Sequence, residues 1–419
     1  IGAGLGHMSL WLAERGHHVT VATTYLPARG SRTLNGVDIA EFRVAGNLAR
    51  GITGESERYR RYVLAANYDV FMVKAAQQWT LDALLPVLDR MKKPKVFIPC
   101  GFSGLYDPAY ADYFRQMSGV LREFDRLIFY ASDYRDINFA REHGLTRVTI
   151  LPNGASEHEF NVPRDPHFRA RHGIPEGAFV ILTVGGLTGL KGHRELADAF
   201  SLADFAGKRA VLILNGNRPP QGRFAGAATL RYLYREGGMR GLVKSLSKHA
   251  LLRLGCGSLL GSLGYSLSPA SELDKLVPRI NGSSSNKRAM VVDLPRPELI
   301  QAYLNSNLFV FASNIEYSPL VLYEAAAAGL PFLSVPVGNA EEIAHWTGGG
   351  VICPAPRDYK GYTRGEPAVL AEHMTGLAGD PGKLRALGEA GRKNWSEQFT
   401  WGKITDRYEA IFGRLISGD

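Results

Sequence analysis

Apolar runs and helical periodicity alternate along most of this 419-residue chain. Runs of about four to eight apolar residues bounded by polar ones are typical of buried strands, and a period of about 3.6 residues is typical of helices. The strands expected on this basis are residues 17–24, 68–73, 95–99, 126–130, 147–151, 178–186, 210–216, 289–294, 308–311, 331–335 and 350–354. Because strands that alternate with helices form parallel sheets covered by those helices, the sequence predicts an α/β protein with doubly wound sheets.

A break in this pattern divides the chain into two predicted domains. The turn "PNG" opens a polar, proline-bearing stretch that continues to Pro175, after which the strand pattern restarts. A chain of 419 residues is also longer than one hydrophobic core usually supports. We therefore expect two Rossmann-like domains, residues 1–165 and 166–397. A long helical tail is expected over residues 382–417. Residues 398–419, which follow the second domain, form its C-terminal part.

The first glycine loop, "IGAGLGH", starts the chain without the strand that should lead into it. We therefore expect the natural N-terminus to extend beyond Ile1. The loop departs from the dinucleotide pattern Gly-x-Gly-x-x-Gly because Gly6 comes one residue early, and the next strand ends in threonines instead of an acidic residue. These departures count against a nicotinamide-dependent oxidoreductase. Gly2 and Gly4 remain candidates for backbone contacts to a phosphate, with a structural turn as the alternative.

Residues 217–287 form an insert in the second domain that is far longer than a usual crossover between strands. Within 218–254, eight basic residues face a single acidic one, so most of the net charge of +9 is local and does not indicate a nucleic-acid-binding protein. Apolar and basic side chains of 239–254 fall on opposite helical faces, as in helices that lie on anionic membranes. A helix packed on its own domain with a solvated basic side explains the same pattern.

The composition is that of an ordinary globular protein, with 45% apolar and 21% charged residues. The three cysteines are widely spaced and fit neither a disulfide framework nor a zinc site, which favours a reducing, cytoplasmic compartment. No apolar run reaches the length of about 18 residues that predicts a membrane-spanning helix.

The stretch "SNIEYSPLVLYEAAAAGLPF" places two glutamates near the end of a predicted strand. It follows the apolar strand "LFVF". A helix is expected with Ser318 as its N-cap, Pro319 as its first residue and Gly329 at its end. Glu316 would then lie in the loop at the carboxyl end of the strand, and Glu324 on the second helical turn. In open α/β sheets this edge is where ligands bind.

A second glycine-rich loop lies in "VILTVGGLTGLKGHRELADAF". A buried strand leads into Gly185 and Gly186, and Lys191 precedes a helix that should start near His193. Glycines let a backbone approach an anion, and a lysine at the helix entrance supplies a charge for it. A solvated lysine without a ligand is the simpler alternative.

Two domains that each offer a glycine loop would form a cleft suited to a nucleoside diphosphate. The carboxylate of Glu324 could accept hydrogen bonds from ribose hydroxyls, and Glu316 could face the polar group attached to the phosphate. Each glutamate alone is better explained as a surface or capping residue. Their position at strand ends, together with the glycine loops, favours the binding site.

These motifs together resemble those of family 4 retaining glycosyltransferases, which have the GT-B fold. The resemblance rests on the Glu-x7-Glu pair in "EYSPLVLYE" and on "GGLTGLKGH", "LPNGASEHEF", "VPVGNAEEI" and "GRKNWSEQFTWGKITDRYEAIF". It covers nearly the whole chain outside the insert. It implies two Rossmann-like domains facing each other across a cleft, with a final helix from about Phe399 that crosses back to the first domain.

The resemblance also implies roles for individual residues. Glu316 would contact the transferred sugar, Lys191 would neutralise the diphosphate, and Glu324 would bind the ribose. The other donor-binding positions would be Gly2, Gly4, Gly185, Gly186, Ser318, Pro319, Leu320, Gly338 and Glu341. Such enzymes need no metal or other cofactor, and this chain contains no Asp-x-Asp tripeptide.

Two positions depart from the family pattern. Gly186 replaces an arginine that usually accompanies the lysine, so that a basic residue such as His193 or Arg194 would have to compensate. Cys100, followed by Gly101, stands where many members place a histidine on the acceptor side. These departures keep a non-catalytic sugar-nucleotide-binding protein or a nucleotide-sugar epimerase open as alternatives.

The expected activity is transfer of a hexose from a nucleoside diphosphate sugar to a hydroxyl, with retention of configuration. The acceptor would be a saccharide or a lipid-linked molecule in the synthesis of a cell-envelope polysaccharide or glycolipid. We expect a cytoplasmic protein, peripheral on the inner face of the membrane if the basic insert binds there, and no nucleic-acid partner.

Overall fold

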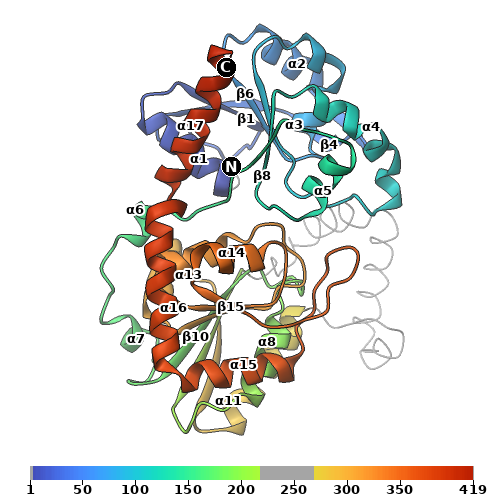
Figure 1. The fold of residues 1–419 in the computed structure, drawn as a ribbon. Helices are drawn as coiled ribbons and strands as arrows, with labels where there is room; N and C mark the ends of the chain where they lie inside the picture. The colour runs from blue at the N-terminus through green and yellow to red at the C-terminus, as the bar shows by residue number, and fades with distance from the viewer. Residues whose placement is uncertain (1–2, 218–268, 419) are drawn as a thin grey trace.

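The computed structural model describes residues 3–217 and 269–418, which form two α/β lobes (Figure 1). The N-lobe contains strands β1–β9 and the C-lobe contains strands β10–β15. Every strand expected from the sequence is present, with ends that differ by a few residues. The α/β class is therefore confirmed.

One parallel six-stranded sheet, in the order β12-β11-β10-β13-β14-β15, forms the centre of the C-lobe. Its strands are β10 (Phe179–Val184), β11 (Ala210–Asn215), β12 (Lys287–Val292), β13 (Leu308–Phe311), β14 (Phe332–Ser334) and β15 (Gly350–Ile352). The strand order reverses between β10 and β13. In doubly wound sheets, such a switch point opens a crevice at the carboxyl ends of the two strands.

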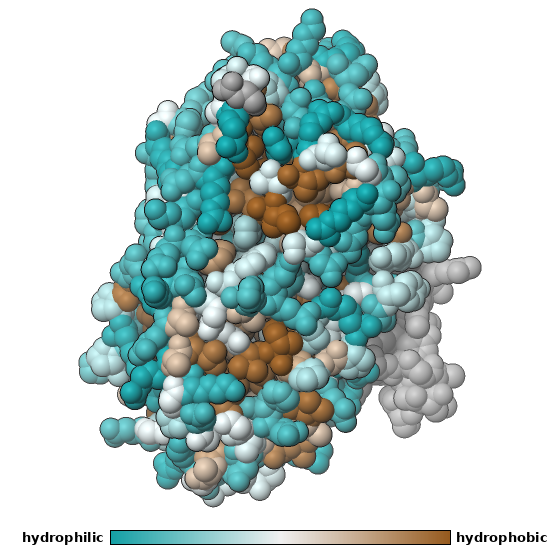
Figure 2. Space-filling model, in the orientation of Figure 1, coloured by the Kyte–Doolittle hydropathy of each residue, from teal (hydrophilic) through white to brown (hydrophobic). Residues whose placement is uncertain are grey.

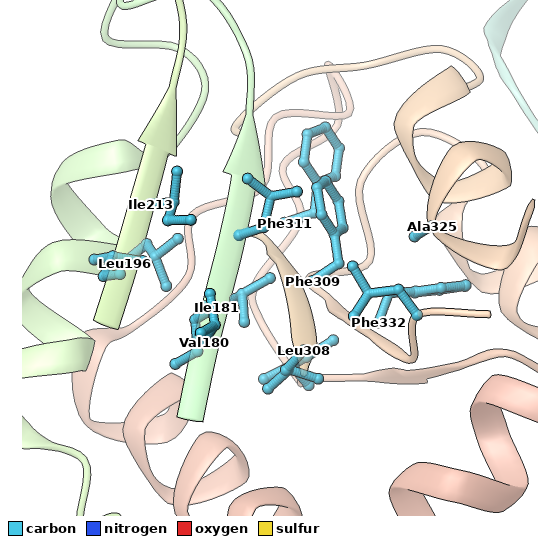
Figure 3. Packing of buried hydrophobic residues seen from close by; sticks show 14 of the residues in the cluster. Val180, Ile181, Leu196, Ile213, Leu308, Phe309, Phe311, Ala325 and Phe332 are labelled. Atoms are coloured by element: carbon cyan, nitrogen blue, oxygen red, sulfur yellow. The ribbon is translucent and has the colours of Figure 1, made fainter. Parts of the chain in front are cut away.

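The core of the C-lobe fixes these two strands in place. Val180, Ile181 and Leu182 of β10 are fully buried, as is every residue of β13 except the 2% exposed Phe311. Figure 3 shows this packing between the strands, with Leu196 approaching from α8 and Ala325 from α13. Burial on both faces explains why the two strands read as continuous apolar runs.

Two separate sheets build most of the N-lobe. Parallel strands β6 (Phe71–Lys74), β7 (Lys95–Ile98), β8 (Arg126–Phe129) and β9 (Val148–Ile150) form one of them. In the other, β1 (Val19–Thr24) pairs in parallel with β3 (Val37–Phe42), which pairs with the short β2 (Thr33–Leu34). A hairpin joins β4 (Val44–Asn47) and β5 (Gly51–Gly54). The sequence analysis missed β2 to β5, although the buried residues Val37, Ile39 and Phe42 gave a signal for β3.

Helices cover the sheets of both lobes (Figure 1). Those of the N-lobe and of the connecting segment are α1 (Ala3–Glu14), α2 (Ser56–Ala65), α3 (Trp79–Asp82), α4 (Ala111–Arg122), α5 (Arg135–Glu142), α6 (Glu157–Phe160) and α7 (Phe168–Arg171). Those of the C-lobe and the tail are α8 (His193–Leu202), α11 (Pro269–Ser283), α12 (Arg296–Asn305), α13 (Leu320–Ala327), α14 (Ala340–Thr347), α15 (Pro367–Gly379), α16 (Pro381–Asn394) and α17 (Trp401–Ser417).

The C-terminal tail, expected to be helical over 382–417 with a final helix from about Phe399, is divided into two helices. α16 ends at Asn394, a π-helical turn covers Trp395–Phe399, and Thr400 is extended before α17 begins. Tertiary contacts cause the break, because Thr400 forms a β-bridge with Ala155 and the Trp395 indole donates to the Ala155 carbonyl at 3.1 Å. The break directs α17 onto α1 of the N-lobe, where the two helices lie side by side (Figure 1).

The surface is mostly polar on the face drawn in Figure 2, with hydrophobic residues gathered in one area of each lobe. Among the described residues, no helix has the length and apolar character needed to cross a bilayer. The basic segment 218–254, for which membrane contact was one of two alternatives, lies outside the described residues. Of the 217–287 insert, the structure describes Asn217 and the part from Pro269 onward, where α11 begins.

Candidate functional site

Two loops meet at the carboxyl ends of β10 and β13, where the strand order reverses. The Asn314 N–H donates to the Leu190 carbonyl at 2.7 Å, which joins the loops directly. Gly192 permits this approach because its φ is +65° and a Cβ there would lie 1.8 Å from the Ala312 carbonyl oxygen. A residue with a side chain would have to separate the loops, so the glycine is required by the geometry.

Lys191 and Glu316 come together across these loops, although they lie 125 positions apart. The Lys191 ammonium pairs with Glu316 Oε1, and the Ser313 hydroxyl donates to the same oxygen at 2.9 Å. Their side chains are 30% and 17% exposed. Both groups are therefore accessible at the switch point while each already has a partner of opposite charge.

Glu324 lies one helical turn inside α13 and is bound on both of its oxygens. Arg296 donates to Oε1 at 2.6 Å and the Tyr303 hydroxyl donates to Oε2 at 2.9 Å. The glutamate side chain is 14% exposed. The sequence analysis missed Arg296, whose signal was its place at the start of a helix that follows β12, on the same edge of the sheet.

The start of α13 corrects one prediction. The helix begins at Leu320 with Pro319 as its N-cap, so Ser318 does not cap it. A residue before proline is biased toward extended backbone, and Pro319 itself is extended here, with φ −70° and ψ 111°. The Ser318 hydroxyl is buried without a hydrogen-bond partner among the described residues. Gly329, with φ +64°, follows the helix end as predicted.

Gly338 and Glu341 take different positions. A Cβ on Gly338 would lie 2.4 Å from the Tyr317 carbonyl oxygen, so its loop packs directly on the loop that carries Glu316. Glu341 is 60% exposed and pairs with Arg357 at 3.4 Å. Its neighbour Glu342, which the sequence analysis missed, reaches the N-lobe and accepts a bond from the Ser132 N–H at 2.9 Å.

On the N-lobe, Cys100 and Gly101 lie against Tyr317, in the loop that carries Glu316. Both have positive φ, +61° and +85°, and a Cβ on Gly101 would lie 2.9 Å from the Tyr317 ring. The Gly101 N–H donates at 2.7 Å to Asp136, whose pKa burial raises to about 6. Burial also raises the pKa of the Cys100 thiol to about 11, so this residue is a neutral thiol at pH 7.

The N-terminal glycines are only partly described. Gly2 lies outside the described residues, and Gly4 belongs to the first turn of α1. Gly185 and Gly186 lie in the loop after β10, where a Cβ on Gly185 would lie 3.0 Å from the Lys191 side chain. Gly185 therefore leaves room for the lysine to fold back over its own loop, whereas a Cβ on Gly186 would lie 3.1 Å from the Asn217 side chain.

Neither residue proposed to compensate for Gly186 takes that role in this structure. His193 is 4% exposed, and burial, together with the Lys191 charge, lowers its pKa to about 4. It is therefore neutral at pH 7, and neither ring nitrogen has a hydrogen-bond partner among the described residues. Arg194 is 58% exposed and directed to Glu272 and Asp198. Among the residues that the structure describes, no group of three or more His, Cys, Asp or Glu side chains is arranged to hold a metal ion.

Solved structures with the same architecture cover almost all of this chain. Sucrose-phosphate synthase from Thermosynechococcus elongatus aligns with a TM-score of 0.66 at 16% identity, over 99% of this chain and 93% of that one. HepE of Anabaena, solved with UDP-glucose, aligns with a TM-score of 0.63 at 16% identity, over 98% and 96%. WaaG, a glycosyltransferase involved in lipopolysaccharide biosynthesis, aligns with a TM-score of 0.55 at 16% identity, over 100% of this chain and 96% of that one. The protein has the GT-B fold.

Sequence similarity is confined to part of this GT-B chain. Residues 285–394, which include Arg296, Glu316 and Glu324, match the family described as Glycosyl transferases group 1. A D-inositol 3-phosphate glycosyltransferase of Catenulispora acidiphila is 32% identical over 30% of this chain, and an N-acetyl-alpha-D-glucosaminyl L-malate synthase of Bacillus anthracis is 30% identical over 27%. The matched parts span 27% and 28% of these relatives, about a quarter of their length.

Proposed function

We propose that the protein is a retaining glycosyltransferase that moves a hexose from a nucleoside diphosphate sugar to a hydroxyl group. The observation that carries this proposal is the Lys191–Glu316 pair at the switch point between β10 and β13. The site offers an ammonium beside a glycine loop and the start of α8, both suited to a diphosphate. The group 1 match over 285–394 and the glycosyltransferase names of the partial relatives support the same class.

In the proposed reaction, the bond between the anomeric carbon and the diphosphate oxygen breaks as the acceptor oxygen approaches from the same face. The leaving diphosphate takes the acceptor proton, and the attack from the same face needs no protein nucleophile. We propose that no metal ion is required, because the Lys191 ammonium supplies positive charge at the diphosphate. Lys191 stabilises the charge that develops on the phosphate, while Glu316 binds the hexose and Glu324 the ribose. Preorganised charge of this kind is commonly the largest catalytic contribution. Contacts across the lobes, such as Glu342 to Ser132, would keep water from the donor.

The backbone around the site would complete the donor pocket. We assign Gly185 and Gly186 to the phosphates, with Gly2 and Gly4 approaching from the N-lobe side. Ser318, Pro319 and Leu320 would line the pocket at the start of α13, and Gly338 and Glu341 in the loop that packs on it. Cys100 and Gly101 would lie on the acceptor side.

The donor and the acceptor are proposed by analogy with solved structures of the same fold. HepE has been solved with UDP and with UDP-glucose, and WaaG acts in lipopolysaccharide biosynthesis. We propose UDP-sugar as donor and a saccharide or lipid-linked acceptor in envelope glycan synthesis. A cytoplasmic location with peripheral membrane contact through 218–254 would fit such an acceptor.

An assay of nucleoside diphosphate release tests the proposal most directly. Purified protein is incubated with UDP-glucose, GDP-mannose or ADP-glucose, with and without acceptor extract and with EDTA, and nucleoside diphosphate release is measured. We expect release from one donor, insensitive to EDTA, that is lost in Lys191→Met and retained in Arg194→Met, which alters a cation outside the site. Anomeric configuration of the product is read by proton NMR. Absence of release from every donor in the presence of acceptor extract would refute the proposal, whether or not a donor binds.

A non-catalytic sugar-nucleotide-binding protein is the second candidate, favoured by Gly186 and by the neutral, buried His193. It predicts tight binding of a nucleoside diphosphate sugar without release of the diphosphate in the presence of acceptor extract. An epimerase would convert the donor alone into an isomeric sugar. Product analysis after incubation with donor alone identifies an epimerase, and diphosphate release with acceptor extract separates the transferase from the binding protein.

A further inference from the structure

Arg296 is a charged side chain bonded to Glu324 to which the proposed reaction gives no role. We propose that Arg296 is a positioning residue that orients Glu324 so that the site selects ribonucleoside diphosphates over their 2′-deoxy and 3′-deoxy forms. This inference rests on the proposed function, because it assumes that Glu324 binds the ribose.

Arg296 bridges two carboxylates from different parts of the chain. Its Nη2 donates to Glu324 Oε1 at 2.6 Å and to Glu159 Oε2 at 2.7 Å, while its Nε donates to Glu159 Oε1 at 2.8 Å. The contact with Glu159 is a two-bond fork, which fixes the plane of the guanidinium as a single bond would not. The third bond therefore reaches Glu324 in a defined direction.

Glu159 gives this bridge a rigid base. It belongs to α6, in the segment that connects the two lobes (Figure 1). Hydrogen bonds from Arg296 lower the pKa of the Glu159 carboxyl against the effect of its burial, so the partner of the fork is ionised at neutral pH. Arg296 thus ties the proposed ribose carboxylate to the connection between the lobes.

Arg296 is also the only cation bonded to this pair of carboxylates among the described residues. His7 lies close enough to feel Glu159, Arg296 and Glu324, but burial lowers its pKa from the usual value and leaves it neutral at pH 7. One positive charge consequently serves two negative ones. Removing it would leave two uncompensated carboxylates beside the proposed diphosphate site.

The bonds to Glu324 leave a specific binding capacity. A carboxylate has about four lone-pair sites, two on each oxygen. Arg296 uses a site on Oε1 and Tyr303 uses a site on Oε2, so each oxygen keeps one site. Two adjacent acceptors in one plane match the adjacent 2′ and 3′ hydroxyls of a ribose. With Arg296 absent, the carboxylate can turn about its terminal torsion, which is a soft one, and this match is lost.

The test compares ribonucleotides and deoxyribonucleotides by isothermal titration calorimetry. UDP, GDP and ADP are titrated first, and the base that binds most tightly is carried forward with its 2′-deoxy and 3′-deoxy forms. Because a hydrogen bond to a charged group contributes more than a neutral one, we expect the wild type to prefer the ribonucleotide by about 10- to 100-fold. In Arg296→Met we expect this ratio to fall to about threefold or less.

Arg171→Met is the matched control. Arg171 also bridges two carboxylates, Asp165 at 2.6 Å and Glu298 at 3.1 Å, and Glu298 lies on the same helix α12 as Arg296. Its removal should leave the ribose-to-deoxyribose ratio unchanged. Arg296→Lys keeps the charge without the planar fork and should give an intermediate ratio, which also preserves the test if the methionine variant does not fold.

The outcomes separate this inference from the proposed function. A wild type that binds no nucleoside diphosphate refutes both. A wild type that binds a nucleoside diphosphate but does not distinguish its deoxy forms refutes the ribose contact and with it the role of Arg296, and leaves the glycosyltransferase proposal intact. An unchanged ratio in Arg296→Met, a full wild-type ratio in Arg296→Lys, or an equal loss in Arg171→Met overturns the role of Arg296 and leaves the glycosyltransferase proposal intact.

Discussion

Replacing Lys191 with methionine should abolish most of the catalysis while leaving the fold intact. The Lys191 side chain is 30% exposed and bonded only to Glu316 among the described residues, and pairs of this kind contribute about 1 kcal/mol or less to stability. Methionine keeps the length and apolar stem of the lysine. We therefore expect a change of only a few degrees in the unfolding midpoint.

The effect on turnover follows from the charge that develops on the leaving phosphate. At an effective dielectric constant of about 20, half a unit of additional negative charge about 3 Å from an ammonium contributes about 2.8 kcal/mol. This energy corresponds to about a 100-fold change in rate. Lys191→Met should accordingly lower kcat by about 100-fold or more, with a smaller effect on the donor KM.

Replacing Glu316, the partner of Lys191, should strengthen the binding of free UDP instead of weakening it. Glu316→Gln removes the charge that now balances the ammonium, so the affinity for free UDP should rise while turnover falls. The assay is diphosphate release at saturating donor, together with calorimetric titration of UDP for both single variants and for the double variant. A kcat for Lys191→Met within threefold of the wild type would refute the reasoning, as would weaker UDP binding in Glu316→Gln.

Three further predictions concern neighbouring positions. In thermal unfolding, Gly192→Ala should destabilise the protein by about 2 kcal/mol or more, because Gly192 has a left-handed backbone and lies against the Ala312 carbonyl. The control Gly376→Ala, in a helix with open space around the glycine, should be neutral or stabilising in the same assay. The pKa of His193 is about 4 in the folded protein and about 6.5 in the unfolded chain, so the folded state loses about 2 kcal/mol of stability as the pH falls from above 6.5 to 5. The His193→Leu variant should therefore lose correspondingly less stability than the wild type between pH 7.5 and pH 5. An identical loss in both proteins would contradict the assignment. Glu324→Ala should weaken donor binding by about 10-fold or more with a smaller change in kcat, and an unchanged donor affinity in calorimetry would remove the ribose contact.

Local sequence patterns were sufficient for the elements that carry the site. The apolar runs of β10 and β13 read correctly because both strands are buried on both faces, which leaves no polar alternation to confuse them. Gly329 marked the end of α13 because only glycine takes its backbone angle without cost. The placement of Glu316 and Glu324 at one edge of the sheet followed from these elements, since the carboxyl ends of parallel strands share that edge.

Long-range contacts decided what local patterns could not. The tail divides at Thr400 because Ala155, distant in sequence, pairs with it there. Thr400 caps the new helix through a bond from the Lys403 N–H. Nothing in the apolar period of residues 382–417 carries that information.

The same division holds for the charged side chains. The sequence by itself determined that Lys191, Glu316 and Glu324 follow strand ends at one edge of the sheet, because strand ends and helix starts are local features. Only the tertiary structure decided their partners: Glu316 meets Lys191, Glu324 meets Arg296, and His193 is buried and neutral. The physical reason is that electrostatic partners and burial depend on distances in space, which residues such as Glu159 and Arg296, 137 positions apart, acquire only when the chain has folded.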